Sequence, residues 1–334
     1  MSDEGTYLLQ NGKGMRAELI AYGGSIASIV VPDRDGRAVE TTLGFDLPEE
    51  YEGARNPCFG ALCGRYANRI GNGRFALDAT EFELPKNEGA HTLHGGPEGF
   101  HKKFWKAERI DDDRVAMSLS SPDGDMGFPG CLDVRVLYVL EGGENALRIE
   151  YEARCDRSTV VNLTNHAYFN LAGHDAGSIR DHLIRIAASR YTVVDDAAIP
   201  TGELREVAGT QMDLREPTPI GLRIDDVQGL GYDHNYCLDR ESDGMLFPAV
   251  EVFAPSTGIL MECLTTEPGM QFYTGNFLDG VPGRNGAVYR KQEGFCLEAQ
   301  HYPDSPNQPA FPSTRLNPGE IYRQTTVYRF GTKG

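Results

Sequence analysis

The stretch LDVRVLYVLEGGENALRIEY, residues 132–151, carries apolar side chains at every second position. Leu132, Val134 and Val136 are two positions apart ahead of the pair Gly142-Gly143, and the same spacing returns in residues 147–151 after it. A period of two is that of a β-strand with one buried face, and a glycine pair readily forms a tight turn. The stretch therefore predicts an antiparallel hairpin.

The same alternation recurs along the chain. Further strands are expected at residues 17–31, 114–120, 160–163, 182–187, 249–254, 259–265 and 320–330. Helical patterns are short, residues 47–55 being the best of them, and 39 glycines with 19 prolines indicate many turns. Since no long helices alternate with the strands, a parallel α/β layout is disfavoured. We expect an all-β fold, a large antiparallel β-sandwich with few short helices.

Composition limits the organisation and the partners. The 334 residues show no linker or composition break, so we expect residues 1–334 to form a single domain. The net charge of −17 argues against nucleic acid and anionic membranes as partners. The first residues lack the basic and apolar segments of a signal peptide. The seven cysteines form no C-x-x-C pair, which favours reduced and mostly buried thiols in a cytoplasmic protein.

Polar clusters in turn-rich segments separate the expected strands. They are CGRYANRIGNGRF (63–75), HTLHGG (91–96), NLTNHAYFNLAGH (162–174), LGYDHNY (230–236), TTEPGMQFYTGNF (265–277) and CLEAQHYPDSPN (296–307). Glu298 is the most informative member, because it lies in an apolar strand where an unpaired carboxylate would be costly to bury. Arg69 is a candidate counter-ion for Glu298. The single tryptophan, Trp105, is expected in the core rather than against a ligand.

The residue types in these clusters fit a polyhydroxylated ligand. Sugar hydroxyls need both hydrogen-bond donors and acceptors, which Arg, Asn, His, Asp, Gln and Glu side chains supply. A metal site is the alternative, but the spacing of an H-E-x-x-H motif is absent. We therefore expect a sugar site without a metal.

Six segments together resemble the aldose 1-epimerase (galactose mutarotase) family. They are GRYANRI (64–70), TLHGG (92–96), NHAYFNLAG (165–173), YDHNY (232–236), TTEPGMQFYTGN (265–276) and LEAQHYPDSPN (297–307). The segments follow the family's order and span most of the chain. The resemblance implies a large antiparallel β-sandwich with an open sugar cleft, and an isomerase that interconverts the α and β anomers of free aldohexoses such as glucose and galactose.

The resemblance also implies roles for individual residues. Glu298 corresponds to the general base and His166 to the general acid, while His94 corresponds to a histidine near the ring oxygen. The remaining correspondences are sugar-hydroxyl ligands, namely Asn68, Arg69, Tyr168, Asp233 and Gln271. Because ring opening and closure only move protons and return them, we expect no cofactor.

Three other functions remain to be weighed. Asp233 and Glu298 could be the carboxylate pair of a glycosidase. A carbohydrate-binding module would not need an acid–base pair such as Glu298 and His166. A hexose-6-phosphate 1-epimerase would need a cationic phosphate pocket, which this acidic chain makes less favourable.

Overall fold

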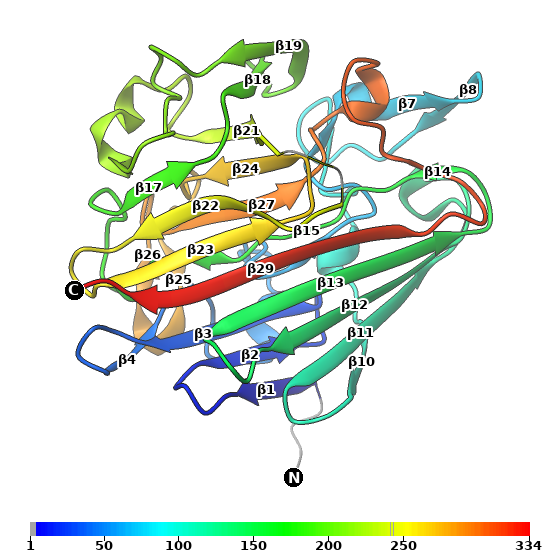
Figure 1. The fold of residues 1–334 in the computed structure, drawn as a ribbon. Coiled ribbons are helices and arrows are strands. Elements are labelled where there is room, and N and C mark those ends of the chain that lie inside the picture. Colours follow the sequence, from blue (N-terminus) through cyan, green and yellow to red (C-terminus); the bar gives the residue numbers. More distant parts are fainter. Residues whose placement is uncertain (1–4, 241, 243) are drawn as a thin grey trace.

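The largest sheet contains the hairpin expected from residues 132–151. The computed structural model describes residues 5–240, 242 and 244–334. Strands β12 (Leu132–Leu140) and β13 (Ala146–Cys155) pair antiparallel, with Leu140 opposite Leu147. The C-terminal strand lies in the middle of this sheet, between β13 and β23 (Figure 1). The nine strands are, in spatial order, β10 (Lys106–Arg109), β11 (Arg114–Ser121), β12, β13, β29 (Tyr322–Thr332), β23 (Ile259–Thr265), β22 (Phe247–Phe253), β17 (Leu183–Ile186) and β20 (Thr218–Pro219).

A second sheet of six antiparallel strands packs against the first. Its order is β16 (Tyr168–Phe169), β27 (Phe295–Gln300), β24 (Gly269–Tyr273), β21 (Asp233–Cys237), β18 (Arg190–Val194) and β19 (Pro200–Glu206). The hydroxyl of Tyr328 on β29 donates a hydrogen bond to the carbonyl of Leu297 on β27, and the rings of Phe169 and Tyr328 are 5.0 Å apart. These contacts place β27 and its neighbour β16 on β29.

Smaller sheets and turns complete the described part of the chain. A four-stranded sheet has the order β1 (Thr6–Gln10), β2 (Arg16–Ile20), β3 (Ser25–Pro32) and β4 (Ala38–Glu40). The two-stranded pairs are β14 (Thr159–Val160) with β28 (Arg315–Leu316), β15 (Thr164–Asn165) with β5 (Leu62–Cys63), β25 (Val281–Pro282) with β26 (Val288–Tyr289), β6 (Arg69–Ile70) with β9 (Thr92–Leu93), and β7 (Arg74–Leu77) with β8 (Thr80–Glu83). The helical segments are 3₁₀ turns, namely η1 (Pro48–Glu52), η2 (Gly71–Gly73), η3 (Phe100–Lys102), η4 (Asp125–Gly127), η5 (Ile220–Leu222), η6 (Ile224–Asp226), η7 (Arg284–Gly286) and η8 (Ser305–Asn307).

The main core fills the space between the two large sheets. Val136 and Ile149 of the nine-stranded sheet belong to the same buried cluster as Phe272 and Leu297 of the six-stranded sheet. Trp105 is also in this cluster, with its indole N–H donating to the carbonyl of Phe100. The expected β-sandwich is therefore confirmed, and the tryptophan is a core residue.

Three expected elements differ in the structure. Residues 47–55 form only the short η1 turn, because Tyr51 is the one residue of that turn that is buried, and Gly53 follows it with extended backbone. The run 17–31 is two strands rather than one, since Gly23 and Gly24 take positive φ angles of 66° and 57° and turn the chain. The strand expected at 160–163 covers only Thr159–Val160.

The cysteines agree in part with the expectation of mostly buried, reduced thiols. Four thiols are buried, at Cys63, Cys237, Cys263 and Cys296, whereas Cys131 is exposed, and all seven are free. Among the residues that the structure describes, no helix has the length and apolar character needed to cross a membrane.

Candidate active site

Glu298 lies on the face of the six-stranded sheet that points away from the main core. Successive side chains of a strand point to opposite faces, so Leu297 and Ala299 enter the core while Glu298 points outward from it. The strand register places Gln271 of β24 opposite Glu298. Glu298 is nevertheless only 2% exposed, because loops cover this part of the sheet. The strand thus produces the buried carboxylate that the sequence predicted.

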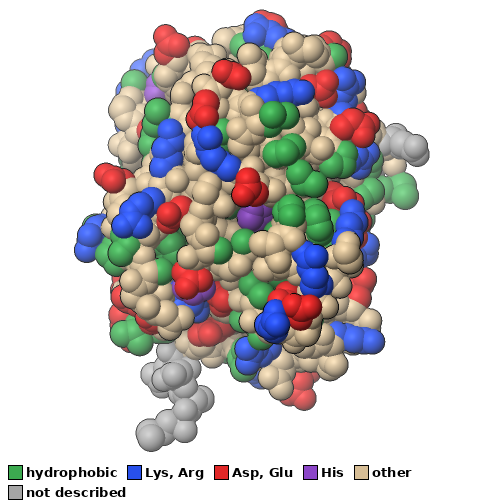
Figure 2. Space-filling model, turned by 90° about the vertical axis from the view of Figure 1, so that its left-hand side faces the viewer, with side chains coloured by type: hydrophobic (Ala, Val, Ile, Leu, Met, Phe, Trp, Pro, Cys, Tyr) green, Lys and Arg blue, Asp and Glu red, His purple; other side chains and the backbone are tan. Residues whose placement is uncertain are grey.

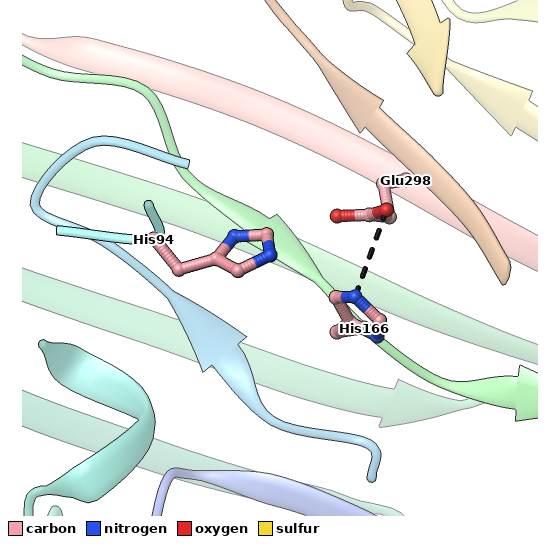
Figure 3. A group of neighbouring side chains, drawn as sticks. All are labelled: His94, His166 and Glu298. Carbon is pink, nitrogen blue, oxygen red and sulfur yellow. Dashed lines mark ion pairs between the residues drawn. The ribbon is translucent and has the colours of Figure 1, made fainter. Parts of the chain in front are cut away.

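Two histidines from separate loops face the Glu298 carboxylate. Nε2 of His166 is 3.7 Å from Oε1 of Glu298. The rings of His94 and His166 lie 5.2 Å apart at an interplanar angle of 83°. Figure 3 shows both rings and the carboxylate turned toward one another, with the dashed line marking the pair of His166 and Glu298. Residues 94, 166 and 298, far apart in the sequence, therefore form one buried cluster.

The position of His166 is fixed by backbone hydrogen bonds to a neighbouring loop. The backbone N–H of His166 donates to the carbonyl of Ala61 at 2.9 Å, and Gly60 N–H donates to the carbonyl of His166 at 3.0 Å. On the ring, Nδ1 lies 3.5 Å from Sγ of Cys296. With Nδ1 turned to the sheet, Nε2 is directed at Glu298.

His94 is held as a hydrogen-bond donor. The backbone N–H of Asn68 donates to Nδ1 of His94 at 3.2 Å, which uses the lone pair of that nitrogen and places the proton of the neutral ring on Nε2. Burial lowers the pKa of His94 well below the ordinary histidine value, and the neighbouring basic groups of His166, His101 and Arg69 act in the same direction. His94 is therefore neutral, and its Nε2–H serves as a donor.

Arg69 has a different partner from the one suggested by the sequence. Its Nε and one terminal nitrogen donate to the two carboxylate oxygens of Glu88 at 2.6 and 2.7 Å. The other terminal nitrogen is 3.9 Å from Asp233, whose carboxylate also accepts a hydrogen bond from Gln271 at 2.7 Å. The suggested pairing of Arg69 with Glu298 is wrong as the main contact, because the bidentate fork is already filled by Glu88.

Sequence reasoning missed Glu88 altogether. Pairing of β6 with β9 places Arg69 opposite Leu93, and an isolated bridge between Glu88 and His91 turns the preceding chain back toward the arginine. Glu88 lies outside the polar clusters of the sequence. Nothing in its local pattern distinguishes it from a solvated surface glutamate, so only the fold reveals its role.

Two predicted ligands make local contacts at the edge of the cluster. The Tyr168 hydroxyl donates to the carbonyl of Pro57 at 3.2 Å, and its ring lies 5.1 Å from that of His166. The side-chain oxygen of Asn68 accepts the backbone N–H of Arg69 at 2.9 Å. Asn68, Arg69, His94, His166, Tyr168, Asp233, Gln271 and Glu298 thus gather in one region, linked by these contacts.

The environment favours the neutral forms of both members of the central pair. Burial raises the pKa of Glu298 well above its ordinary value, the Asp233 carboxylate adds to that effect, and Arg69 opposes it. Burial lowers the pKa of His166, against the influence of Cys58 and Asp233. The two groups together therefore hold one proton over a wide range of pH.

The three residues of the cluster also have the spacing of metal ligands. One donor atom from each of His94, His166 and Glu298 lies within 4.8 Å of the others. A metal needs a free lone pair on each ligand, but His94 has given that of Nδ1 to the Asn68 N–H, so its Nε2 carries a proton. The arrangement fits hydrogen bonding to a ligand oxygen better than metal coordination.

A cavity of about 550 Å³ adjoins this cluster. Arg69 and Asp233 line it together with Glu88, Asp195 and Asp196. Two of the predicted hydroxyl-binding residues, Arg69 and Asp233, thus open onto a concave, acidic space of the size that small-molecule sites occupy.

Comparison with known proteins assigns the chain to a family. The sequence model of the family described as aldose 1-epimerase matches residues 5–329. The chain belongs to the aldose 1-epimerase family. It is 46% identical to the galactose mutarotase of Bos taurus over 95% of this chain and 91% of that protein. It is 40% identical to the aldose 1-epimerase of Escherichia coli K12, over 96% and 94% of the two chains.

Solved structures of the aldose 1-epimerase family share the fold. A GalM/aldose epimerase homologue from C. elegans superposes with a TM-score of 0.92 at 30% identity, covering 99% of both chains. The galactose 1-epimerase of Lactobacillus acidophilus gives a TM-score of 0.84 at 28% identity, over 98% of this chain and 94% of that one. The chain is thus an isomerase that acts on carbohydrates.

Proposed function

We propose that this protein interconverts the α and β anomers of free aldohexoses, with Glu298 as the general base and His166 as the general acid. The observation that carries the assignment is the buried pair itself, with Nε2 of His166 3.7 Å from Oε1 of Glu298. The C1 hydroxyl and the ring oxygen are bonded to the same hemiacetal carbon. Two groups a few ångströms apart can therefore reach both oxygens at once.

The reaction consists of two proton movements and their reversal. The reacting form of the pair carries its single proton on His166, to which it moves from Glu298. In this form Glu298 takes the proton of the C1 hydroxyl while His166 gives its proton to the ring oxygen, and the bond between C1 and the ring oxygen breaks. After rotation about C1–C2, the two groups act in the opposite sense and the ring closes on the other face of the carbonyl. Since the pair regains its single proton at the end, no redox step or group transfer occurs.

The neighbouring side chains suit the binding of sugar hydroxyls. Neutral His94 presents its Nε2–H beside the pair and can donate to a substrate oxygen. Arg69 supplies donors, while Asp233 supplies acceptors and is itself oriented by Gln271. Asn68 and Tyr168 complete the proposed ligand set.

The test is the Glu298→Gln variant, assayed by polarimetry of freshly dissolved α-glucose. Loss of a general base should slow the reaction about 10²–10⁴-fold, with sugar binding largely retained. A variant that keeps more than about a tenth of the wild-type rate would refute the assignment, because a loss of less than about tenfold is smaller than the ordinary contribution of a general base. His166→Asn should cause a similar loss.

Glu267→Gln is a matched control for this experiment. Glu267 is also a buried carboxylate, and it pairs with His301 at 2.6 Å outside the proposed site. Its substitution should lower stability but leave the anomerisation rate within a few-fold of wild type. A rate loss as large as that of Glu298→Gln would show that the loss of any buried carboxylate in this part of the protein stops activity.

The observations disfavour the competing functions. The adjoining cavity is acidic, because it is lined by Glu88, Asp195, Asp196 and Asp233. The arginine in its lining, Arg69, is already paired with Glu88, so a phosphate group would meet repulsion. On the face shown in Figure 2, basic side chains are interspersed with acidic ones rather than gathered. We expect no preference for hexose 6-phosphates and no release of aglycone from aryl glycosides.

A further inference from the structure

Cys58 differs from the other thiols of the protein in its position. It is half-buried and lines a cavity of about 370 Å³ together with His101, Lys102 and Glu98. Cys63 ends the same short loop, and its thiol interacts with that of Cys58. A small reagent that enters this cavity therefore meets the Cys58 thiol, and the buried thiol of Cys63 lies on the same loop.

The loop between these two cysteines holds His166. Within the loop, Ala61 N–H donates to the carbonyl of Cys58 at 3.2 Å. Gly60 and Ala61 make the two backbone hydrogen bonds to His166. Cys63 lies opposite Thr164 in the antiparallel pair of β5 and β15, and Thr164 is two residues before His166. A change in the shape of residues 58–63 must therefore move the backbone of His166.

The surroundings of Cys58 favour its thiolate. Interaction with the Cys63 thiol lowers the pKa of Cys58 to about 7, against the effect of burial, and His166 and Lys102 add to the lowering. Burial instead raises the pKa of Cys63 well above the ordinary value and that of Cys237 to about 11. The titratable groups that face Cys58 directly or across its cavity are Cys63, His166, Lys102, His101, Glu98, Glu52, Tyr22, Tyr51, Tyr168, Cys296 and Glu298.

We propose that Cys58 is a modification site for peroxides, that Cys63 resolves the oxidised thiol as a disulfide, and that this cross-link inactivates the enzyme by displacing His166. In the first step the Cys58 thiolate attacks a peroxide oxygen, the O–O bond breaks, and hydroxide leaves and takes up a proton. In the second step the Cys63 thiol attacks the sulfenic sulfur, the S–O bond breaks, and water leaves. Two thiols lose two electrons, and hydrogen peroxide is reduced to two waters.

The chemical part of the proposal is tested by mass spectrometry on the folded protein. Hydrogen peroxide should produce a peptide cross-link between Cys58 and Cys63, and iodoacetamide at pH 7 should label Cys58 roughly five- to tenfold faster than the exposed Cys131. Faster labelling of Cys131, or a peroxide product without the 58–63 cross-link, would overturn it. These readouts do not depend on anomerisation, so their failure is distinct from failure of the proposed function.

The functional part is tested with Cys58→Ser, Cys63→Ser and Cys131→Ser. Peroxide should reduce the anomerisation rate of wild type and Cys131→Ser at least about fivefold, and dithiothreitol should restore it. Cys58→Ser should keep its rate under the same treatment, while Cys63→Ser should gain oxygen at Cys58 without forming the cross-link. Equal inactivation of wild type and Cys58→Ser would refute the proposal. Should Cys58→Ser fail to fold, the recovery of wild type by dithiothreitol together with its peptide map decides the matter.

Discussion

Replacing Glu88 with alanine removes both acceptors that orient the Arg69 guanidinium. In the native protein, two nitrogens of Arg69 donate to Glu88 at 2.6 and 2.7 Å, and the third nitrogen lies 3.9 Å from the Asp233 carboxylate. Without Glu88, the guanidinium is expected to turn toward Asp233, which is the nearest remaining carboxylate. The predicted hydroxyl-binding groups would then pair with each other instead of with the sugar.

The size of the effect follows from the two hydrogen bonds and their exposure. A hydrogen bond to a charged group contributes about 1.5–3 kcal/mol, but the Glu88 side chain is 37% exposed and solvent screens the pair. We therefore expect a loss of about 1–2 kcal/mol in sugar binding, which corresponds to a rise in KM of roughly 5- to 30-fold. Because Glu88 does not contact the reacting oxygens in the proposed mechanism, kcat should fall by less than about threefold.

Polarimetric initial rates over a range of glucose concentrations separate the two constants. Glu88→Gln keeps one acceptor oxygen and should lie between wild type and Glu88→Ala. Glu83→Gln is the control, because Glu83 is an exposed glutamate of β8 whose contact with Arg74 is 3.9 Å long. An unchanged KM in Glu88→Ala, or a fall in kcat alone, would refute the idea that Glu88 acts by positioning Arg69.

Three further predictions concern pH and stability. Burial disfavours both the doubly protonated, cationic form and the fully deprotonated, anionic form of the His166–Glu298 pair. On the acid side, kcat/KM should therefore fall only below the ordinary histidine pKa of 6.5, and on the alkaline side only well above the ordinary glutamate pKa of 4.5. An acid limb above pH 6.5 would contradict this. Gly60→Ala should destabilise the protein and reduce activity, because residue 60 has a φ of +66° and a Cβ there would lie 1.8 Å from a backbone oxygen. Gly36→Ala is the control: residue 36 has a φ of +79° but open space around it, so the substitution should lower the free energy of unfolding in urea by only about 1 kcal/mol. Arg65→Met should lower the free energy of unfolding by about 3–5 kcal/mol, because the buried guanidinium donates to several backbone carbonyls that would lose their partner; a loss below about 1 kcal/mol would show that water replaces it.

Local patterns determined the strands and the residue types of the site. The period of two in residues 132–151 depends only on neighbouring positions, and it produced β12 and β13 as expected. The same logic identified Glu298 as a costly buried carboxylate. Where the pattern was weak, as in residues 47–55, packing left too little buried surface for a longer helix. A single domain over 1–334 and a cytoplasmic location stay predictions.

Only the tertiary structure decided which of these groups meet and in what protonation state. The pairing of Arg69 with Glu88, the tautomer of His94 and the contact of Cys58 with Cys63 all join chain segments through turns that have no local signature. Burial, which no single residue specifies, sets the pKa directions of Glu298 and His166. The sequence thus supplied the proposed acid and base, and the strand that carries Glu298, because alternation is a short-range property. Distances and desolvation are long-range properties, so the folded chain alone determined them.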